Sequence, residues 1–434
     1  MKKLVALLLA AIMVLSMAAI ASADEEGKVL NIYCWNDEFK TRVEKFYTFP
    51  EGITVNWVIT PSDNGAYQLA LDDALKAQAT ADADKKVDMF LVEADYAVKY
   101  VDTAYTLDVI ADLGLTEADV ADMYQYTKDI MTDSNGILKG LSWQACPGGF
   151  IYRRDYAQEI LGVSEPDQVQ EYLSDWDKFD AVAAQAKEKG IFMLSGYDDA
   201  YRCFSDNMET PWVVDGVIVK DPAIEAWITM TKKYTENGWN NKANLWSPES
   251  GAGATKDGKV FGYFGPAWFI DFCLAGWTLD DSSAPAALGN GSWGEWGFCE
   301  GPVGFSWGGT WVCAAAGTDN LTLVADLMKT MTCNKDVLVD IVKEYGDFTN
   351  NVPAMTEMAA SDFSNAFLGG QNYLGLMLKN AQNINRAQST MYDQACSECI
   401  QNAMADYYNG VVSLDEAWDN YFANVEERHP DLTH

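Results

Sequence analysis

Three short apolar runs near the start of the chain have the length and composition of buried strands. They cover residues 29–36, 53–60 and 87–92, and helical patterns separate them. The pattern before the third run spans 66–78, where leucine and alanine recur at helical spacing. Strands that alternate with helices in this way predict an α/β unit with a parallel sheet.

Long helical patterns dominate the later part of the chain. One begins at Ser174, a candidate N-cap, and carries its apolar residues on a single face. A second runs from Asp221-Pro222 to Asn237-Gly238, residues typical of a helix start and a helix stop. Further helical patterns cover 321–345 and 387–408. The chain therefore predicts a second, helix-rich lobe.

The first 23 residues have the pattern of a cleavable export signal. Lys2 and Lys3 precede an apolar run over 4–20, and Ala21-Ser22-Ala23 is a small-x-small cleavage site. The alternative, an uncleaved anchor helix, needs about 20 apolar residues and a stop-transfer flank. We expect cleavage near Ala23 and a mature protein that lies outside the cytoplasm without inserting into a membrane.

The composition limits the class of partner and the number of domains. A formal net charge of −34 argues against nucleic acid or an anionic membrane surface as the partner. A chain of 434 residues exceeds the size at which one core keeps growing, so two lobes are expected. Nine cysteines leave at least one thiol unpaired, and most lie in apolar runs where burial is the expected role.

Two patterns resemble catalytic sites without completing one. Gly304-Phe305-Ser306-Trp307-Gly308 matches the G-x-S-x-G elbow of serine hydrolases, but His429 and His434, near the C-terminus, are the chain's only histidines. We interpret the match as chance. Glu93 and Asp95 stand two apart at a predicted strand end, which suits a glycosidase pair or a pair of hydroxyl acceptors.

Aromatic residues at strand-to-loop junctions are the strongest functional signal. Several stand beside glycine, asparagine or aspartate, a combination that suits a ligand with apolar faces and hydroxyl edges, such as a sugar. Trp57, Trp176 and Trp227 lie within predicted strands or helix faces and are expected in the core. The junction residues are Trp35, Trp143, Tyr197, Trp212, Trp268, Trp307 and Trp311.

Taken in order, six segments resemble the extracellular solute-binding proteins of carbohydrate ABC transporters, the group that includes maltodextrin-binding proteins. The resemblance spans nearly the whole mature chain, and the order and spacing of the motifs make it specific. The segments are Asn31-Ile-Tyr-Cys-Trp35-Asn36, Val87-Asp88-Met89-Phe90, Gly149-Phe150-Ile151-Tyr152-Arg153-Arg154-Asp155, Trp176-Asp-Lys-Phe179, Tyr263-Phe-Gly-Pro266-Ala-Trp268 and Ser306-Trp307-Gly308-Gly309.

The resemblance implies an α/β fold of the two-lobed periplasmic-binding-protein type (type II, Venus-flytrap). The lobes are joined by three crossings, expected near Ala145, Gly301 and Asn350, and a cleft between them closes on ligand by hinge motion. An N-lobe of 24–145 and 302–350 and a C-lobe of 146–301 and 351–434 follow from these crossings.

The resemblance also implies a ligand site in the cleft. Trp268 is the expected stacking ring, with Trp35 and Trp307 as further aromatic contacts. Asp198 and Arg202 are expected to form a salt-linked pair that grips ring hydroxyls, although a structural ion pair is an open alternative. Gln371 follows two glycines and could equally belong to an ordinary turn. Asn36, Glu93, Asp95, Trp143, Asp198, Arg202 and Gln371 complete the predicted site.

The predicted function is that of a transport-associated binding protein for a sugar or oligosaccharide. Its expected partners are the permease subunits of an ABC importer, and we expect a monomer without catalysis, cofactor or metal. Two alternatives stay open: a cationic ligand such as a polyamine bound in the same fold, and a secreted glycoside hydrolase. A cationic ligand would require the acids to crowd the aromatic centre without Arg202.

Overall fold

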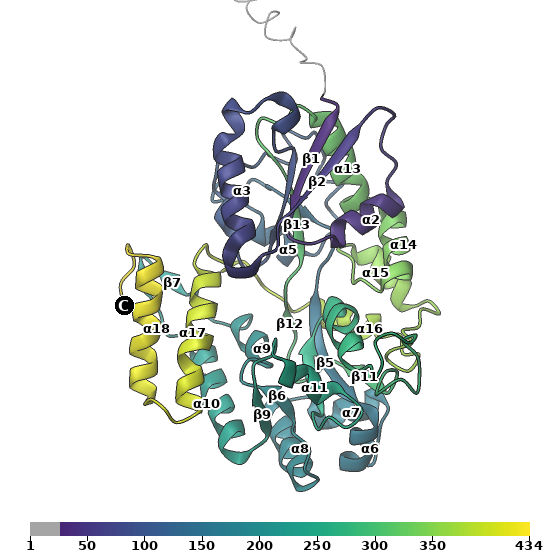
Figure 1. The fold of residues 1–434 in the computed structure, drawn as a ribbon, viewed down its shortest axis with the longest axis vertical. Helices are drawn as coiled ribbons and strands as arrows, with labels where there is room; N and C mark the ends of the chain where they lie inside the picture. The colour runs from purple at the N-terminus through teal and green to yellow at the C-terminus, as the bar shows by residue number, and fades with distance from the viewer. Residues whose placement is uncertain (1–26) are drawn as a thin grey trace, which may run out of the picture.

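The computed structural model describes residues 27–434 and contains two main sheets with helices around each (Figure 1). The predicted signal segment 1–23 lies outside the described residues. Within 27–434 no helix is long and apolar enough to cross a membrane. All nine cysteines are free thiols, and seven of them are buried.

The first sheet has the strand order β2-β1-β3-β13-β4. β1 (Val29–Cys34), β2 (Thr54–Ile59) and β3 (Met89–Glu93) are parallel, while β13 (Thr310–Ala314) runs antiparallel between β3 and β4 (Leu141–Ser142). The three strands expected from the sequence are confirmed, as is the helix between the second and third, α3 (Ala66–Ala77).

Helices cover both faces of this sheet, which explains the continuous apolar runs of its central strands. On β3, Phe90 and Val92 pack on the side of α3, whereas Met89 and Leu91 pack on the opposite side. The opposite layer contains α2 (Glu38–Phe46) and α13 (Leu321–Cys333). The remaining helices of this part are α4 (Val98–Val101), α5 (Gln125–Ile130), α14 (Lys335–Tyr345) and α15 (Val352–Ala359).

The second sheet is built on β5 (Pro147–Arg153), which pairs antiparallel with β10 (Gly262–Gly265), β11 (Trp296–Cys299) and β12 (Phe305–Ser306). Gly148 is required where β12 crosses, because a Cβ atom there would lie 2.2 Å from the Phe305 ring. Two small ribbons accompany this sheet: β6 (Leu194–Gly196) with β9 (Asn240–Ala243), and β7 (Val213–Val214) with β8 (Val217–Ile218).

Many helices surround the second sheet, as the sequence predicts. α8 (Trp176–Glu188) is capped by Asp175, whose carboxylate accepts a bond of 2.9 Å from the Lys178 amide, so Ser174 is not the N-cap. α10 (Pro222–Asn237) begins at its predicted start, where Asp221 is the N-cap. The others are α6 (Arg154–Leu161), α7 (Pro166–Leu173), α9 (Tyr201–Ser205), α11 (Pro248–Ala254), the π-helix η4 (Phe269–Leu274), α12 (Ala275–Trp277), α16 (Leu374–Ala381), α17 (Asp393–Tyr408) and α18 (Leu414–Arg428).

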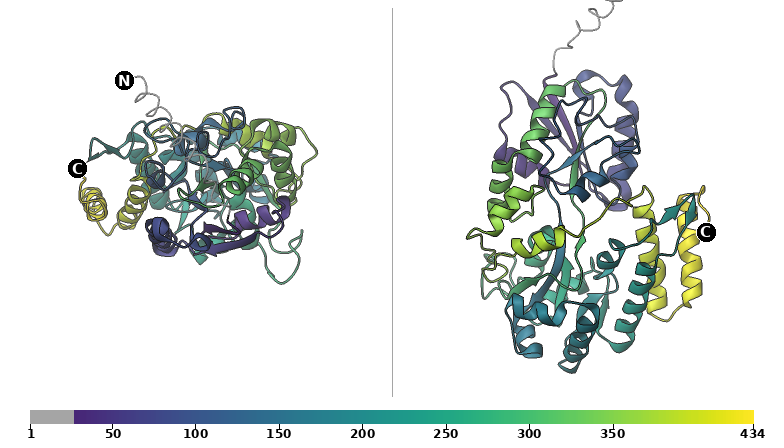
Figure 2. Two further views of the ribbon diagram at one scale, coloured as in Figure 1. Left: turned by 90° about the horizontal axis from the view of Figure 1, so that it is seen from above. Right: turned by 180° about the vertical axis from the view of Figure 1, so that it is seen from behind.

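The chain passes repeatedly between the two sheets. The first passage lies between β4 and β5, close to the expected position near Ala145. β12 pairs with β5 and β13 with β3, so the second passage falls at 307–309 rather than near Gly301. α15 packs on α14, so the third passage follows α15 instead of lying near Asn350. The chain then reaches α16 against β5 and crosses the back of the molecule to α17 and α18 (Figure 2).

Candidate functional site

Two adjoining cavities lie between the two sheets. The larger, about 530 Å³, is lined mainly by polar side chains, and we call it the polar compartment. The smaller, about 300 Å³, is lined by four tryptophans and a phenylalanine, and we call it the aromatic compartment. Trp35, Glu93, Trp246 and Trp307 line both cavities and form a neck between them.

The topology explains why these side chains meet. Trp35 follows β1 and Glu93 ends β3, so both stand at the carboxyl edge of the parallel strands. Thr310, the first residue of the antiparallel β13, pairs with Glu93 and brings the second passage to the same edge. Trp307 lies in that passage, while Trp246 follows β9 in the second lobe. The neck therefore has walls from both lobes.

Trp307 is held in place by its neighbours in the aromatic compartment. Its carbonyl accepts a hydrogen bond of 2.9 Å from the Trp268 indole, and the two rings meet edge to face with centroids 4.9 Å apart. The next residues, Gly308 and Gly309, have φ of +72° and +104°, values that residues with a Cβ rarely adopt. These glycines let the chain turn so that the Trp307 ring borders both compartments.

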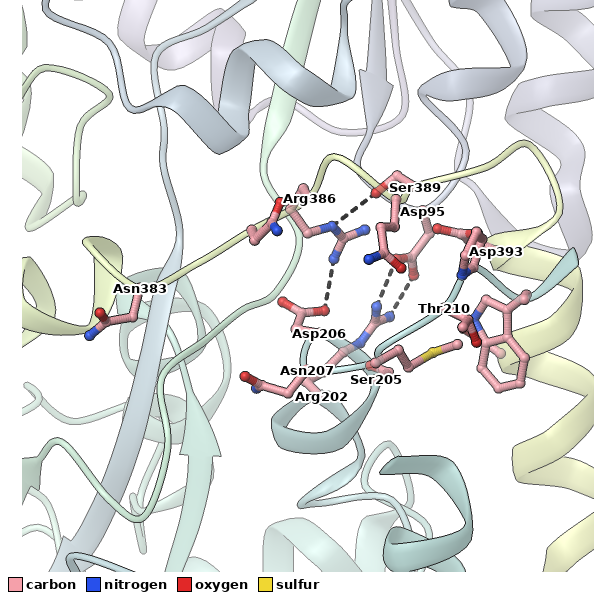
Figure 3. A pocket seen from close by; sticks show the side chains of 16 residues that line it. Asp95, Arg202, Ser205, Asp206, Asn207, Thr210, Asn383, Arg386, Ser389 and Asp393 are labelled. Carbon is pink, nitrogen blue, oxygen red and sulfur yellow. Dashed lines mark hydrogen bonds and ion pairs between the residues drawn. The ribbon is translucent and has the colours of Figure 1, made fainter. Parts of the chain in front are cut away.

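A half-buried ion pair connects the two lobes at the polar compartment, where its side chains also line a third cavity, of about 250 Å³ (Figure 3). The Arg202 guanidinium on α9 donates two parallel bonds to the Asp95 carboxylate in the turn after β3, at 2.7 and 2.5 Å. Burial alone would raise the pKa of Asp95, but Arg202 holds it below its ordinary value. The expected Asp198–Arg202 pair is wrong: Asp198 instead accepts a bond of 3.0 Å from the Leu245 amide.

Glu93 at the neck is an acid whose charged form is disfavoured. Burial, and then the charge of Asp95, raises the pKa of Glu93 to about 8. One of its oxygens accepts a bond of 2.8 Å from the Asp95 amide. At neutral pH the protonated carboxyl can donate one hydrogen bond and accept others, which suits a hydroxyl group.

Several further acids that are wholly or partly buried also have a raised pKa, and together they predict how the free energy of unfolding depends on pH. Burial raises the pKa of Asp198 to about 6 and, with the charge of Asp198, that of Asp199 to about 8. Burial also raises the pKa of Asp393 to about 6 and, together with the charge of Asp347, that of Glu38 to about 7.

The folded chain therefore holds more protons than the unfolded chain between about pH 4 and pH 8, so raising the pH destabilises it. We expect the free energy of unfolding to fall by more than about 1 kcal/mol from pH 5 to pH 8.5. Urea unfolding at several pH values measures this. The double variant Glu93→Gln, Asp199→Asn should flatten the profile. A rise in stability with pH would contradict the assignment.

Two predicted site residues lie outside the cleft. Trp143 has no exposed surface and stacks on Phe39 in the core of the first lobe, with centroids 5.0 Å apart. The Gln371 amide exchanges two bonds, of 2.9 and 2.8 Å, with the backbone of Phe298, so it extends the edge of β11 as a structural side chain. The remaining predicted residues, Trp35, Asn36, Glu93, Asp95, Asp198, Arg202, Trp268 and Trp307, line one or both compartments.

Two large aromatic residues of the aromatic compartment are not among the predicted site residues. Trp246 and Phe272 are 58% and 57% exposed, unusual values for such side chains. Trp246 stands in Asn244-Leu245-Trp246 after β9, the same strand-to-loop signal used for the other tryptophans. Polar residues on α3 and α17 were also missed, because the solvent-facing side of a helix has the same composition as a binding surface: Gln68, Gln394, Glu398, Gln401 and Asn402.

The hydrolase motif has no catalytic surroundings. The Ser306 hydroxyl donates to Asp206 at 2.7 Å, and β12 leads into the passage at 307–309 instead of a helix. His434 stacks on Phe422 and His429 contacts Tyr392, both at the C-terminal end of the chain. The arrangement supports the interpretation of a chance match.

Two lobes that enclose an aromatic cleft define a class of binding proteins, and the comparisons with known proteins agree with this. Residues 42–367 match the family of bacterial extracellular solute-binding proteins. The chain therefore belongs to that family, as its motifs predicted. No curated protein is detectably similar in sequence.

Solved structures confirm the two-lobed α/β fold. An extracellular solute-binding protein of family 1 matches with a TM-score of 0.74 and 16% identity, over 92% of this chain and 99% of that one. The galacto-N-biose-/lacto-N-biose I-binding protein from Bifidobacterium longum matches with a TM-score of 0.69 and 15% identity, over 94% of this chain and 100% of that one. An ABC transporter-associated binding protein from B. animalis subsp. lactis, in complex with β-1,6-galactobiose, matches with a TM-score of 0.67 and 17% identity, over 94% of this chain and 100% of that one.

Proposed function

We propose that this protein binds a sugar or oligosaccharide in the cleft and delivers it to the permease of an ABC importer. The observation that carries the proposal is the neck, where tryptophans from both lobes meet a carboxyl group that can be protonated. Aromatic rings stack on the apolar faces of sugars, while amides and acids bond to the hydroxyl edges. The related structures with lacto-N-biose and β-1,6-galactobiose support this ligand class.

A cationic ligand such as a polyamine fits the cleft less well. The Arg202 guanidinium carbon lies 5.9 Å from the centre of the Trp307 ring, where a bound cation would be attracted to the ring face. The raised pKa of Glu93 further reduces the negative charge at the neck. These two features favour an uncharged group beside Trp307.

A glycoside hydrolase is also disfavoured. Such an enzyme needs one protonated and one ionised carboxyl group on opposite sides of the scissile bond. Glu93 supplies the first, but both oxygens of Asp95 are bonded to Arg202. We therefore propose binding without turnover, by a monomer that an N-terminal signal directs out of the cytoplasm. The two lobes close on the sugar by hinge motion, and the closed form is the one that the permease recognises.

A thermal-shift assay tests the proposal, because a ligand that binds only the folded state raises the melting temperature. We expect maltose, maltotetraose, lactose, lacto-N-biose or β-1,6-galactobiose to stabilise the protein, by about 2.7 kcal/mol at one hundred times Kd. Spermidine is the control for a cationic ligand, and chromatography of the incubated sugars detects turnover. Stabilisation by spermidine alone, or release of a product, would contradict the proposal.

A further inference from the structure

The Asp95–Arg202 ion pair in the cleft affects which sugars the site can accept. We propose that Asp95 acts as a built-in carboxylate that occupies Arg202, so that the site selects uncharged sugars over uronic acids. The inference rests on the proposed function and narrows its substrate class.

The Asp95–Arg202 pair has the geometry that an arginine offers to an acidic ligand. Its two parallel bonds are the bidentate arrangement by which guanidinium groups bind carboxylates. The two side chains are only 20% and 16% exposed, and both line the polar compartment. Asp95 therefore fills the position that the carboxylate of a uronic acid would need.

The pair still leaves bonding capacity for uncharged hydroxyl groups. A guanidinium has five N–H groups, of which Asp95 takes two, and each carboxylate oxygen can accept more than one bond. A sugar hydroxyl can therefore bond to either side chain without separating them. An anionic ligand would have to displace Asp95 and leave that carboxylate without its cation.

The neighbouring cation, Arg386, already has partners of its own. Among residues 27–434, Arg202 is the only lysine or arginine that lines either compartment. Arg386 lines a third cavity, of about 250 Å³, together with Asp95 and Arg202, and bonds to Asp206 at 2.8 Å and to Ser389 at 3.1 Å (Figure 3). The acids of the two compartments, by contrast, are Glu38, Glu93, Asp95, Asp198, Asp199 and Glu398.

The partner of Arg386 is also unable to replace Asp95. Asp206 stands four residues after Arg202 on the chain, but besides Arg386 it binds both the amide and the hydroxyl of Ser306, each at 2.7 Å. These bonds tie Asp206 to the strand that enters the second passage. Removal of the Asp95 charge is thus expected to leave Arg202 available to a ligand.

The experiment uses matched pairs of disaccharides. The uncharged probes are maltose, lactose and β-1,6-galactobiose, and each is compared by calorimetry with its counterpart oxidised to a uronic acid at the terminal C6. The full mature chain is expected to bind the uncharged member of each pair at least about 100-fold more tightly than the uronic acid. Asp95→Asn should reduce this ratio of affinities at least about 10-fold, because Arg202 can then pair with the carboxylate of the ligand. Adding Arg202→Gln to Asp95→Asn should remove the improved binding of the uronic acid.

Two outcomes would overturn the inference. They are equal binding of both members by the unaltered protein, or a folded Asp95→Asn variant whose ratio of affinities for the two members is unchanged. Asp95→Ser frees the same guanidinium and replaces Asp95→Asn if circular dichroism shows the latter unfolded. Absence of binding to every disaccharide would instead overturn the proposed function, and the inference with it.

Discussion

Replacement of Trp307 by alanine is expected to weaken sugar binding by at least about 2 kcal/mol, roughly a 30-fold rise in Kd. Trp307 borders both compartments, so its ring can contact a ligand on either side of the neck. It also contacts Trp246 and Trp268, with centroids 5.7 and 4.9 Å away, and its loss would loosen both. Calorimetry with the best sugar from the thermal screen measures the change.

Two other tryptophans serve as comparisons for this experiment. Trp268 borders the aromatic compartment alone, so Trp268→Ala is expected to cost at least about 1 kcal/mol of binding but less than Trp307→Ala. Trp57 lies on β2 and packs on Phe39, away from the cleft, so Trp57→Phe should leave Kd unchanged. An unchanged Kd in Trp307→Ala, with the fold intact, would remove this residue from the site.

The sequence was informative about elements whose burial is decided locally. The strands at β1, β2 and β3 are short apolar runs covered on both faces or at a sheet edge, so composition and length identify them. The helical pattern over 321–345 continues without a visible break, yet Asn334 divides it into α13 and α14 by capping the second helix. A cap inside a periodic pattern is easily overlooked because the apolar face continues across it.

Prediction was weaker wherever a contact joins distant parts of the chain. Asp95 and Arg202 are separated by 107 positions, and nothing local shows that Arg202 turns to Asp95 instead of the nearer Asp198. The packing of the two lobes against each other decides that choice. The polar residues of α17 are a second example, since only the return of the chain across the back of the molecule brings this helix to the cleft.

Trp143 is a single residue whose surroundings the local sequence also does not show. It stands at a strand-to-loop junction like Trp35 and Trp307, and the sequence gives all three the same signal. Trp35 and Trp307 follow their strands into the cleft, whereas Trp143 follows β4 at the sheet's edge and turns inward onto Phe39. Local pattern identifies the junction, and the position of the strand within the sheet determines which side the ring faces.

Because Trp143 lies in the core and Trp307 in the cleft, mutation of Trp143 should change stability and leave sugar affinity almost unchanged. Trp143→Ala is expected to lower the free energy of unfolding by about 3 to 5 kcal/mol, because it empties a fully buried site in the first lobe. Sugar affinity, measured well below the lowered melting temperature, should change by less than about twofold, since the ring does not reach the cleft.

Trp143→Phe is the matched control for Trp143→Ala. It keeps an aromatic ring against Phe39 and removes an indole N–H for which the described structure shows no partner, so we expect less than half of the destabilisation. Urea unfolding gives the stabilities and calorimetry the affinities. Loss of sugar binding in a stably folded Trp143→Phe variant would return this residue to the site, because a ring buried behind the sheet edge has no direct route to the ligand.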